Sequence, residues 1–313
     1  MTTFLRILQA EFLKIFARRR NWVLIGVLLV LAFAPTYVTQ LFPPSEHDWR
    51  TELREENSKI EKTLVEGQLT GSERQHKLDA AALNQYRLDH DMPPEEQSVW
   101  GTVQSLSMLT SIITLLSVIV AADSIASEFS WGTIKMLLTR PVGRTKLLMA
   151  KYVSVVGFAL MLIGILAAAG FVQGLIDHGF GHVALPHLTL IDGAVQEKSM
   201  ILHTLQTYGL KSVNLLMIVT FAFMISAVAR SSSMSVLLSC VLLFTGTTVT
   251  FLFGEKAWAK YILFANTNLT PYLNGGAPLP GMTLGFSIVM LTAYFAMFHA
   301  AAWYFFTRRD VAG

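Results

Sequence analysis

Six apolar stretches, each about 20 residues long, constrain this chain more than any other feature of its sequence. A helix needs about 20 apolar residues to cross a hydrocarbon layer of roughly 30 Å. The composition agrees, because 53% of the 313 residues are hydrophobic and only 14% are charged, too few for the surface of an ordinary soluble domain. The sequence therefore predicts an all-α membrane protein with six transmembrane helices. These are residues 22–41, 99–122, 152–176, 210–229, 234–253 and 282–306.

The distribution of charge predicts how these helices are oriented. Arg18, Arg19 and Arg20 directly precede the first apolar stretch, and Arg308 and Arg309 follow the last. Basic residues beside spans are retained on the cytoplasmic side, so we expect both termini in the cytoplasm of a multi-pass plasma-membrane protein. In this placement the inward segments hold 13 of the 24 Lys and Arg residues but only 4 of the 21 Asp and Glu residues. The net charge of +3 thus reflects topology and predicts no nucleic-acid-binding surface.

Residues 4–20 predict a helix that lies in the membrane interface. Leu5, Leu8, Phe12 and Ile15 fall on one stripe, and polar side chains fall elsewhere, the pattern of an interfacial amphipathic helix. A signal peptide is the alternative, but the apolar stretch that follows is too long for one and lacks a small-residue cleavage site.

Residues 45–98 differ in character from the rest of the chain. They contain 7 basic and 13 acidic residues and no stretch long enough to span. Apolar residues recur at helical spacing before Gly67 and after Gly71, which predicts two helices joined by a turn. We expect an external helical hairpin.

The segment before the last apolar stretch fits neither a loop nor a span. No charged residue occurs between Lys260 and Arg308, yet residues 254–281 are rich in Asn, Gly and Pro. Such a backbone would be unsatisfied in lipid unless protein covered it. This pattern favours a re-entrant element before the last span.

Residues 123–146, between the second and third apolar stretches, carry the motif that bears on function. Apolar side chains at helical spacing predict a short amphipathic helix over 127–138, and Pro141 ends it. Gly132 inside this helix indicates a close approach of backbone to a neighbour. The motif reads Glu128-Phe129-Ser130-Trp131-Gly132-Thr133-Ile134-Lys135, then Leu137-Leu138-Thr139-Arg140-Pro141-Val142 and Arg144.

This string resembles the first cytoplasmic loop of the ABC-2 type transporter permeases, and the order of apolar segments along the whole chain is similar to theirs. The resemblance implies that residues 1–313 form one transmembrane domain of an ATP-driven exporter. It implies a coupling helix that docks a separate ATPase subunit, two copies per complex, and a second permease chain, identical or different. The implied docking residues are Glu128, Phe129, Trp131, Gly132, Thr133 and Ile134.

The second apolar stretch contains a stripe of hydroxyl side chains along one face. Hydroxyl and small residues of this kind pack helices together, at a dimer face or within one subunit, and they can also line a translocation path. The sequence leaves these interpretations open. The stripe consists of Ser107, Thr110, Ser111, Thr114 and Ser117.

Several chemistries lack their motifs in this sequence. There is no phosphate-binding loop, so we expect no enzyme activity and no cofactor on this chain, with ATP and Mg²⁺ bound by the partner. The predicted spans contain no carboxylate well inside them, which disfavours an ion-coupled carrier. Cys240 is the only cysteine. Histidines 178, 182, 187 and 203 lie among Gly and Pro residues, so a metal site is not predicted.

The charge-free spans favour a hydrophobic substrate, such as a drug, an antimicrobial peptide or a lipid, over a polar solute. A membrane sensor or scaffold that binds a ligand through the external hairpin is the alternative function.

Overall fold

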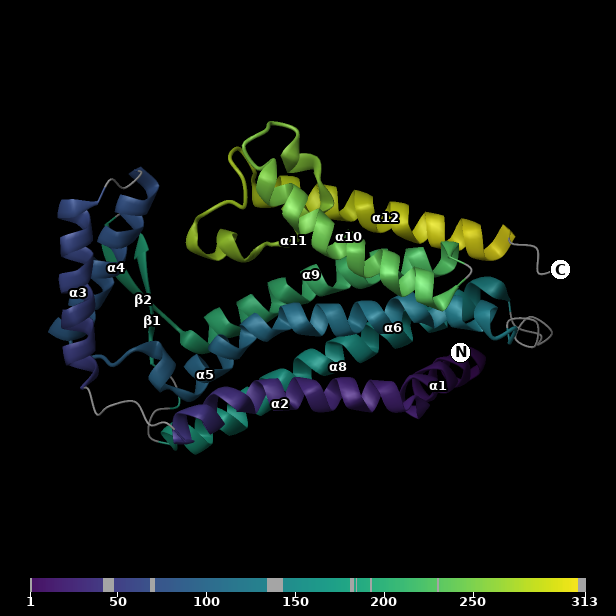
Figure 1. Ribbon diagram of the computed structural model, residues 1–313, viewed down its shortest axis with the longest axis horizontal. Coiled ribbons are helices and arrows are strands. Elements are labelled where there is room, and N and C mark those ends of the chain that lie inside the picture. The colour runs from purple at the N-terminus through teal and green to yellow at the C-terminus, as the bar shows by residue number, and fades with distance from the viewer. Residues whose placement is uncertain are drawn as a thin grey trace. The chain divides into compact units, whose positions relative to one another are not determined.

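The computed structural model describes residues 2–41, 48–67, 71–133, 143–180, 183, 185–191, 193–229 and 231–308. Within this part of the chain, six helical segments are long and apolar enough to span a membrane (Figure 1), which confirms the predicted class of all-α membrane protein. They are α2 (Arg19–Leu41), α5 (Val99–Leu106) continued by α6 (Thr110–Ser130), α8 (Arg144–His178), α9 (Met200–Val228), α10 (Ser232–Leu252) and α12 (Leu284–Arg308).

The chain divides into two compact units. Unit 1 comprises Met1–Leu29, Met108–Leu166 and Tyr208–Gly313. Unit 2 comprises Val30–Ser107 and Ala167–Thr207. The helices α2, α8 and α9 contribute residues to both units.

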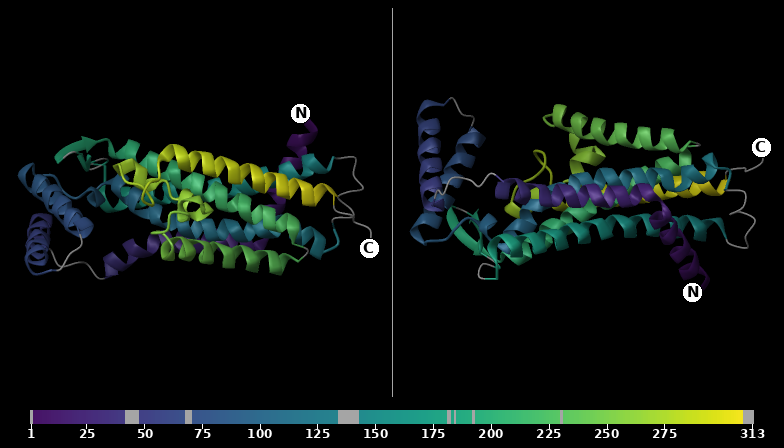
Figure 2. Two further views of the ribbon diagram at one scale, coloured as in Figure 1. Left: turned by 90° about the horizontal axis from the view of Figure 1, so that it is seen from above. Right: turned by 60° about the horizontal axis from the view of Figure 1, so that its bottom comes forward.

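Unit 1 begins with α1 (Thr2–Ala17), the helix predicted from the apolar stripe at the N-terminus. Figure 2 shows that α1 turns away from the axis of α2. The turn is fixed by Asn21, whose buried side-chain amide donates a hydrogen bond of 2.7 Å to the carbonyl of Ile15.

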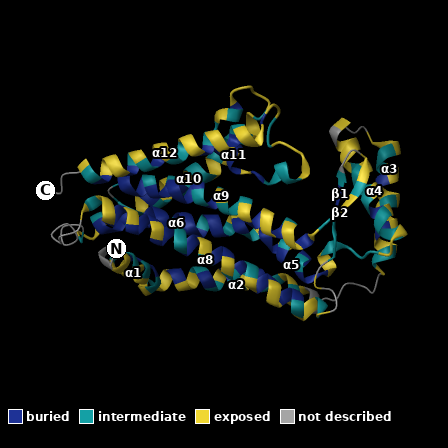
Figure 3. Ribbon diagram, turned by 180° about the vertical axis from the view of Figure 1, so that it is seen from behind, coloured by how far each residue is buried: buried dark blue, intermediate teal, exposed yellow. Residues whose placement is uncertain are grey.

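Helix α10 packs along α6 in unit 1. Its buried residues are Ser235 and Ser239, and such small side chains allow two helices to approach closely. Elsewhere α10 and α12 expose large apolar side chains (Figure 3). Exposed apolar surface of this extent is unusual for a soluble monomer and agrees with contact to lipid.

The segment before α12 folds into three short helices, η3 (Ala259–Tyr261), α11 (Leu263–Thr267) and η4 (Thr270–Asn274). Side chains satisfy its irregular backbone. The buried Asn266 amide donates to the carbonyls of Lys260 and Ile262 at 2.7 and 2.9 Å, and the Tyr294 hydroxyl donates to the Tyr261 carbonyl at 2.8 Å. Side chains thus satisfy three carbonyls of this segment, and the re-entrant element stays a prediction.

Unit 2 contains the two helices predicted for the insert, η1 (Glu95–Gln97) and a small sheet. Helices α3 (Trp49–Glu66) and α4 (Gly71–Asp89) lie side by side. The antiparallel strands β1 (His187–Ile191) and β2 (Ala194–Lys198) pair beside α4. Each strand is only five residues long, and neither is among the elements predicted from the sequence.

Close packing of α8 against α5 in unit 2 depends on two glycines. A Cβ atom on Gly174 would lie 2.8 Å from the Val99 Cα, and one on Gly170 would lie 3.2 Å from the Val103 Cα. Both distances are shorter than ordinary van der Waals contact, and the shorter one, at Gly174, requires the Val99 backbone to shift for any larger residue. These residues form a small-xxx-small motif, which packs helices in membranes.

Candidate functional site

The first residues of the predicted coupling segment belong to a spanning helix. Residues 123–130 complete α6, and Gly143 is followed by α8 from Arg144, so the loop is shorter than the predicted 123–146. The predicted helix over 127–138 is wrong at its start, because α6 ends at Ser130 and residues 131–133 form a turn. Gly132 adopts a left-handed conformation with φ of 68°, which terminates helices and favours glycine.

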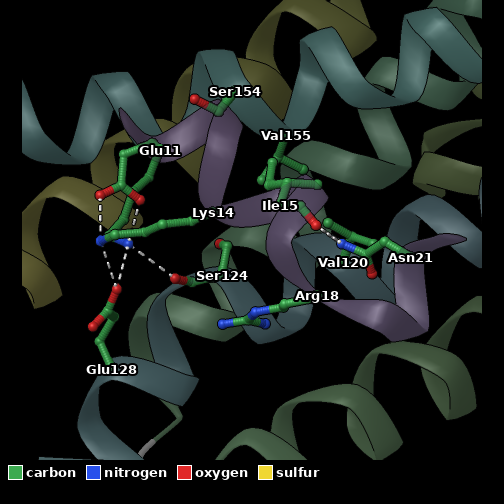
Figure 4. A pocket seen from close by; sticks show the side chains of 11 residues that line it. Glu11, Lys14, Ile15, Arg18, Asn21, Val120, Ser124, Glu128, Ser154 and Val155 are labelled. Carbon is green, nitrogen blue, oxygen red and sulfur yellow. Dashed lines mark hydrogen bonds and ion pairs between the residues drawn. The ribbon is translucent and has the colours of Figure 1, made fainter. Parts of the chain in front are cut away.

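Glu128 in the last turn of α6 belongs to a group of four charged residues, three of them buried, here called the Glu128 cluster. Its Oε1 lies 3.1 Å from Lys151 Nζ and 3.3 Å from Lys14 Nζ. The carboxylate of Glu11 reaches the same two ammonium groups, each at 2.8 Å. Two carboxylates and two ammonium groups therefore alternate, and their charges sum to zero, in a pocket between α1, α6 and α8 (Figure 4).

Burial makes these pairs energetically important. Lys151, Glu11 and Glu128 are only 3%, 6% and 8% exposed. A buried charge is tolerated only when it is paired, and removing one partner typically costs about 3–5 kcal/mol. For Lys14, burial lowers the pKa, but the hydrogen bond and charge of Glu11 and the charge of Glu128 outweigh it and leave the pKa raised.

A second group, the Asp123 cluster, is centred five residues before Glu128 on α6. Asp123 is 4% exposed and accepts hydrogen bonds from the guanidinium groups of Arg18 and Arg20 and from the hydroxyl of Ser232. Arg18 also donates to the Ser127 hydroxyl at 3.0 Å, and its guanidinium carbon lies 5.0 Å from the centroid of the Trp131 ring. The junction of α1 and α2 is thereby tied to α6 and α10.

The predicted docking residues lie in different environments. Glu128 faces inward, and its carboxylate accepts hydrogen bonds from Lys14, Lys151 and the Thr133 hydroxyl. Phe129 packs partly buried against an apolar cluster. Trp131 is 66% exposed, next to Gly132, and Ile134 lies outside the described residues. Trp131 is thus the side chain available for contact.

The hydroxyl stripe also divides. Ser107, Thr110, Thr114 and Ser117 are buried, as helix packing predicts. Ser111 is exposed, and with Thr114 it lines a cleft of about 390 Å³ bounded by α6, α9, α10 and α11. Thr114 is both buried and part of the cleft wall, so helix packing and a cavity wall overlap in this stripe.

The charged clusters were not predicted from the sequence. No carboxylate was expected well inside a span, but the candidate span Val99–Ser130 includes Asp123 and Glu128. The hydropathy signal fades at Asp123, whereas the helix continues because Arg18, Arg20, Lys14 and Lys151 neutralise both acids. Lys151 could have indicated a buried ion pair, because it is a single charged residue among apolar ones.

Six apolar helices and paired charges within them define a multi-pass membrane protein. The chain belongs to the family described as "Protein of unknown function (DUF2705)", whose model matches residues 83–312.

Several relatives are similar to this chain. "Uncharacterized protein YhcI" of Bacillus subtilis is 40% identical over 98% of this chain and 99% of its own length. "Uncharacterized membrane protein YdbK" of the same organism is 29% identical over 69% of this chain and 85% of its own length. A shorter match, 39% identical over 95 residues and 30% of each chain, is to "Probable ABC transporter permease protein NosY" of Pseudomonas aeruginosa.

Proposed function

We propose that this chain is the transmembrane permease subunit of an ABC-2 type exporter. The observation that carries the proposal is the exposed Trp131 turn at the end of α6, which the two charged clusters hold against α1 and α8. The residues of this turn are those that resemble the family's docking segment. The partial similarity to a probable ABC transporter permease supports the same assignment.

In this proposal a separate ATPase binds ATP and Mg²⁺ and docks on the turn through Trp131, Gly132, Thr133 and Ile134. Glu128 acts as a positioning residue, because its pairs with Lys14 and Lys151 join the turn to α1 and α8. A displacement of the turn then moves α6, α1 and α8 together, because separating them would expose unpaired buried charges. Two ATPase copies and two permease chains complete the exporter, and this chain performs no ATP chemistry.

Co-purification tests the proposal. The chain extracted in mild detergent should retain an ATPase subunit, and Trp131→Ala should lower the amount retained about tenfold or more. A tenfold loss corresponds to about 1.4 kcal/mol, and truncation of an aromatic hot-spot residue costs about 2 kcal/mol or more. Trp258→Ala is the matched control, because Trp258 is also exposed, at 51%, and lies outside the docking segment. Equal retention by both variants would contradict the docking role.

A ligand-binding sensor or scaffold is the second candidate. The observation in its favour is a polar cavity of about 440 Å³ in unit 2, lined by residues of α3, α4, η1 and α5 that include Glu52, Asn84, Arg87 and Gln104. A sensor would co-purify with a kinase or a protease and not with an ATPase of the ABC type, so the same experiment separates the two candidates.

A further inference from the structure

Among the described residues, no ionisable side chain lines the cleft between α6, α9, α10 and α11. Half of its lining is apolar, including Ile112, Ile218 and Phe264, and the other half carries hydroxyl or amide groups. Binding sites for small molecules combine these features, with apolar walls for area and a few polar groups for orientation. The absence of charge in the wall excludes a preference for an ionic ligand, which would enter without a counter-charge.

Asn214 is the most informative residue of the cleft. It lies in the middle of α9 and is half-buried, yet its amide has no hydrogen-bond partner among the residues that the structure describes. An amide offers two donors and an acceptor, and leaving such a group unsatisfied away from water is costly. Polar side chains within spanning segments are usually functional for this reason. The unsatisfied amide points to a ligand that carries a complementary group.

Other polar groups of the cleft divide into donors and acceptors. Ser111 on α6 has no partner in the described part of the chain. Asn268 accepts a hydrogen bond from Thr270 at 2.7 Å through its oxygen, which leaves its amide nitrogen available. The hydroxyls of Thr114, Thr247 and Thr267 donate to carbonyls of their own helices, so towards the cleft they can only accept. The cleft thus offers both donors and acceptors.

The wall of the cleft is fixed by close packing. The Phe264 ring occupies the place where a side chain on Gly246 would be, 2.0 Å from an ideal Cβ atom. Because Gly246 is on α10 and Phe264 on α11, a glycine here lets the aromatic ring lie directly on the helix. A preformed site loses less entropy on binding than one that must be ordered.

We infer that this cleft binds an uncharged amphipathic molecule. Its amide, ester or hydroxyl group pairs with Asn214, and its apolar part lies along Ile112, Ile218 and Phe264. The inference deepens the proposed function. It rests on that function only where the bound molecule is called a substrate, because binding itself requires neither ATP nor a partner subunit. Such a molecule could be a membrane lipid or a compound that partitions into the membrane, and both share this chemistry.

Photolabelling with three matched probes tests the inference. A dodecanamide with a diazirine in its alkyl chain should label the purified chain saturably, on peptides of α6, α9, α10 or α11. The diazirine-bearing dodecane lacks the amide, and the dodecylamine analogue is cationic. Each should require at least about tenfold more probe for half-maximal labelling, the factor that corresponds to about 1.4 kcal/mol. Equal saturation by all three probes would overturn the inference.

Variants locate the binding determinant. Asn214→Leu should raise the half-maximal amide-probe concentration about five- to tenfold, the loss of roughly one hydrogen bond, whereas Asn214→Gln should stay within about threefold. Thr247→Val should weaken labelling about threefold. Thr248→Val is its matched control, since Thr248 is equally exposed and bonded on α10 but does not line the cleft. Unchanged labelling in Asn214→Leu and Thr247→Val would contradict the inference.

Native mass spectrometry of the same samples distinguishes the sources. A lipid retained by the wild-type chain and lost from Asn214→Leu identifies the ligand as a membrane lipid, and saturable probe labelling without a retained lipid identifies a partitioning compound. Both results support the site. A change of oligomeric mass in Asn214→Leu with unaltered labelling would show that Asn214 faces a second copy, which overturns it. Failure of ATPase co-purification leaves these measurements unaffected.

Discussion

The charged clusters and the cleft both include residues of α6, but their polar groups differ in how they are paired. Near its C-terminal end, Asp123 and Glu128 are buried and every charge has a partner. At its other end, Ser111 and Thr114 line an uncharged cleft in which the Asn214 amide has no partner among the described residues. Paired polar groups stabilise and position an element, whereas unpaired ones indicate binding. Substitutions in the two regions should therefore affect different measurements.

The largest effect is expected from Lys151→Met, which leaves Glu11 and Glu128 with one ammonium group between them. Breaking a buried ion pair costs about 3–5 kcal/mol, so thermal unfolding in detergent should occur at a much lower temperature. Lys146→Met on the same helix is the control, because Lys146 is exposed, and it should change stability by less than about 0.5 kcal/mol. Equal unfolding temperatures for the two variants would show that the ion pairs of the Glu128 cluster do not stabilise the fold.

Gly174→Leu should have the next largest effect. The added side chain would overlap the Val99 backbone, and overpacking of this kind costs about 1–3 kcal/mol. Gly164→Leu on the same helix is the control, because a Cβ atom there meets nothing within 4 Å. Differential scanning fluorimetry of both variants measures the difference, and a greater loss in Gly164→Leu would contradict the packing argument.

Asp123→Asn should destabilise the chain less than Lys151→Met. The substitution keeps the shape but removes the charge, and the side chains of Arg18 and Arg20 are 27% and 40% exposed, so water can solvate them. We expect a loss of about 1–2 kcal/mol, that of charge-assisted hydrogen bonds. The same variant should loosen Trp131, which tryptophan fluorescence would report as a red shift. An unshifted spectrum with full stability would show that the Asp123 cluster does not hold the turn.

The smallest effect concerns acid stability in unit 2. Burial raises the pKa of Glu95, but the His187 hydrogen bond, the Leu188 N–H and the charges of His187 and Arg87 lower it further, so the pKa ends below its ordinary 4.5. A carboxyl whose pKa is depressed by folding stabilises the fold above its unfolded pKa, and this stabilisation is lost as the pH falls through the folded pKa.

Glu95→Gln should therefore reduce stability at pH 7 and flatten its decline below pH about 4.5. Glu96→Gln is the control, since Glu96 is exposed. Unfolding curves between pH 3 and 7 compare the two, and an identical acid profile for wild type and Glu95→Gln would contradict the assigned contacts.

The sequence was sufficient for the spans and the hairpin helices, because both depend on apolar spacing. It was insufficient where long-range pairing decides the structure. Helix α6 continues past Asp123 only because basic residues far along the chain neutralise it.

The β-hairpin was missed although Asp192-Gly193 is a hairpin signal. Its strands are short, and Leu188 is held by a hydrogen bond to Glu95, which is remote in sequence. Asn214 was overlooked because one amide barely alters the hydropathy of a span, and its importance depends on which neighbours leave it without a partner.

The most direct test of the central claim places a thiol at the exposed turn. In a Cys240→Ser background, Trp131→Cys should be protected from a membrane-impermeant maleimide in intact cells and should react in inverted vesicles. With a short bifunctional reagent it should cross-link to a separate ATPase subunit. Full reaction in intact cells, or ATP-independent activity of the isolated chain in vesicles, would contradict the account of a membrane subunit driven by a cytoplasmic ATPase.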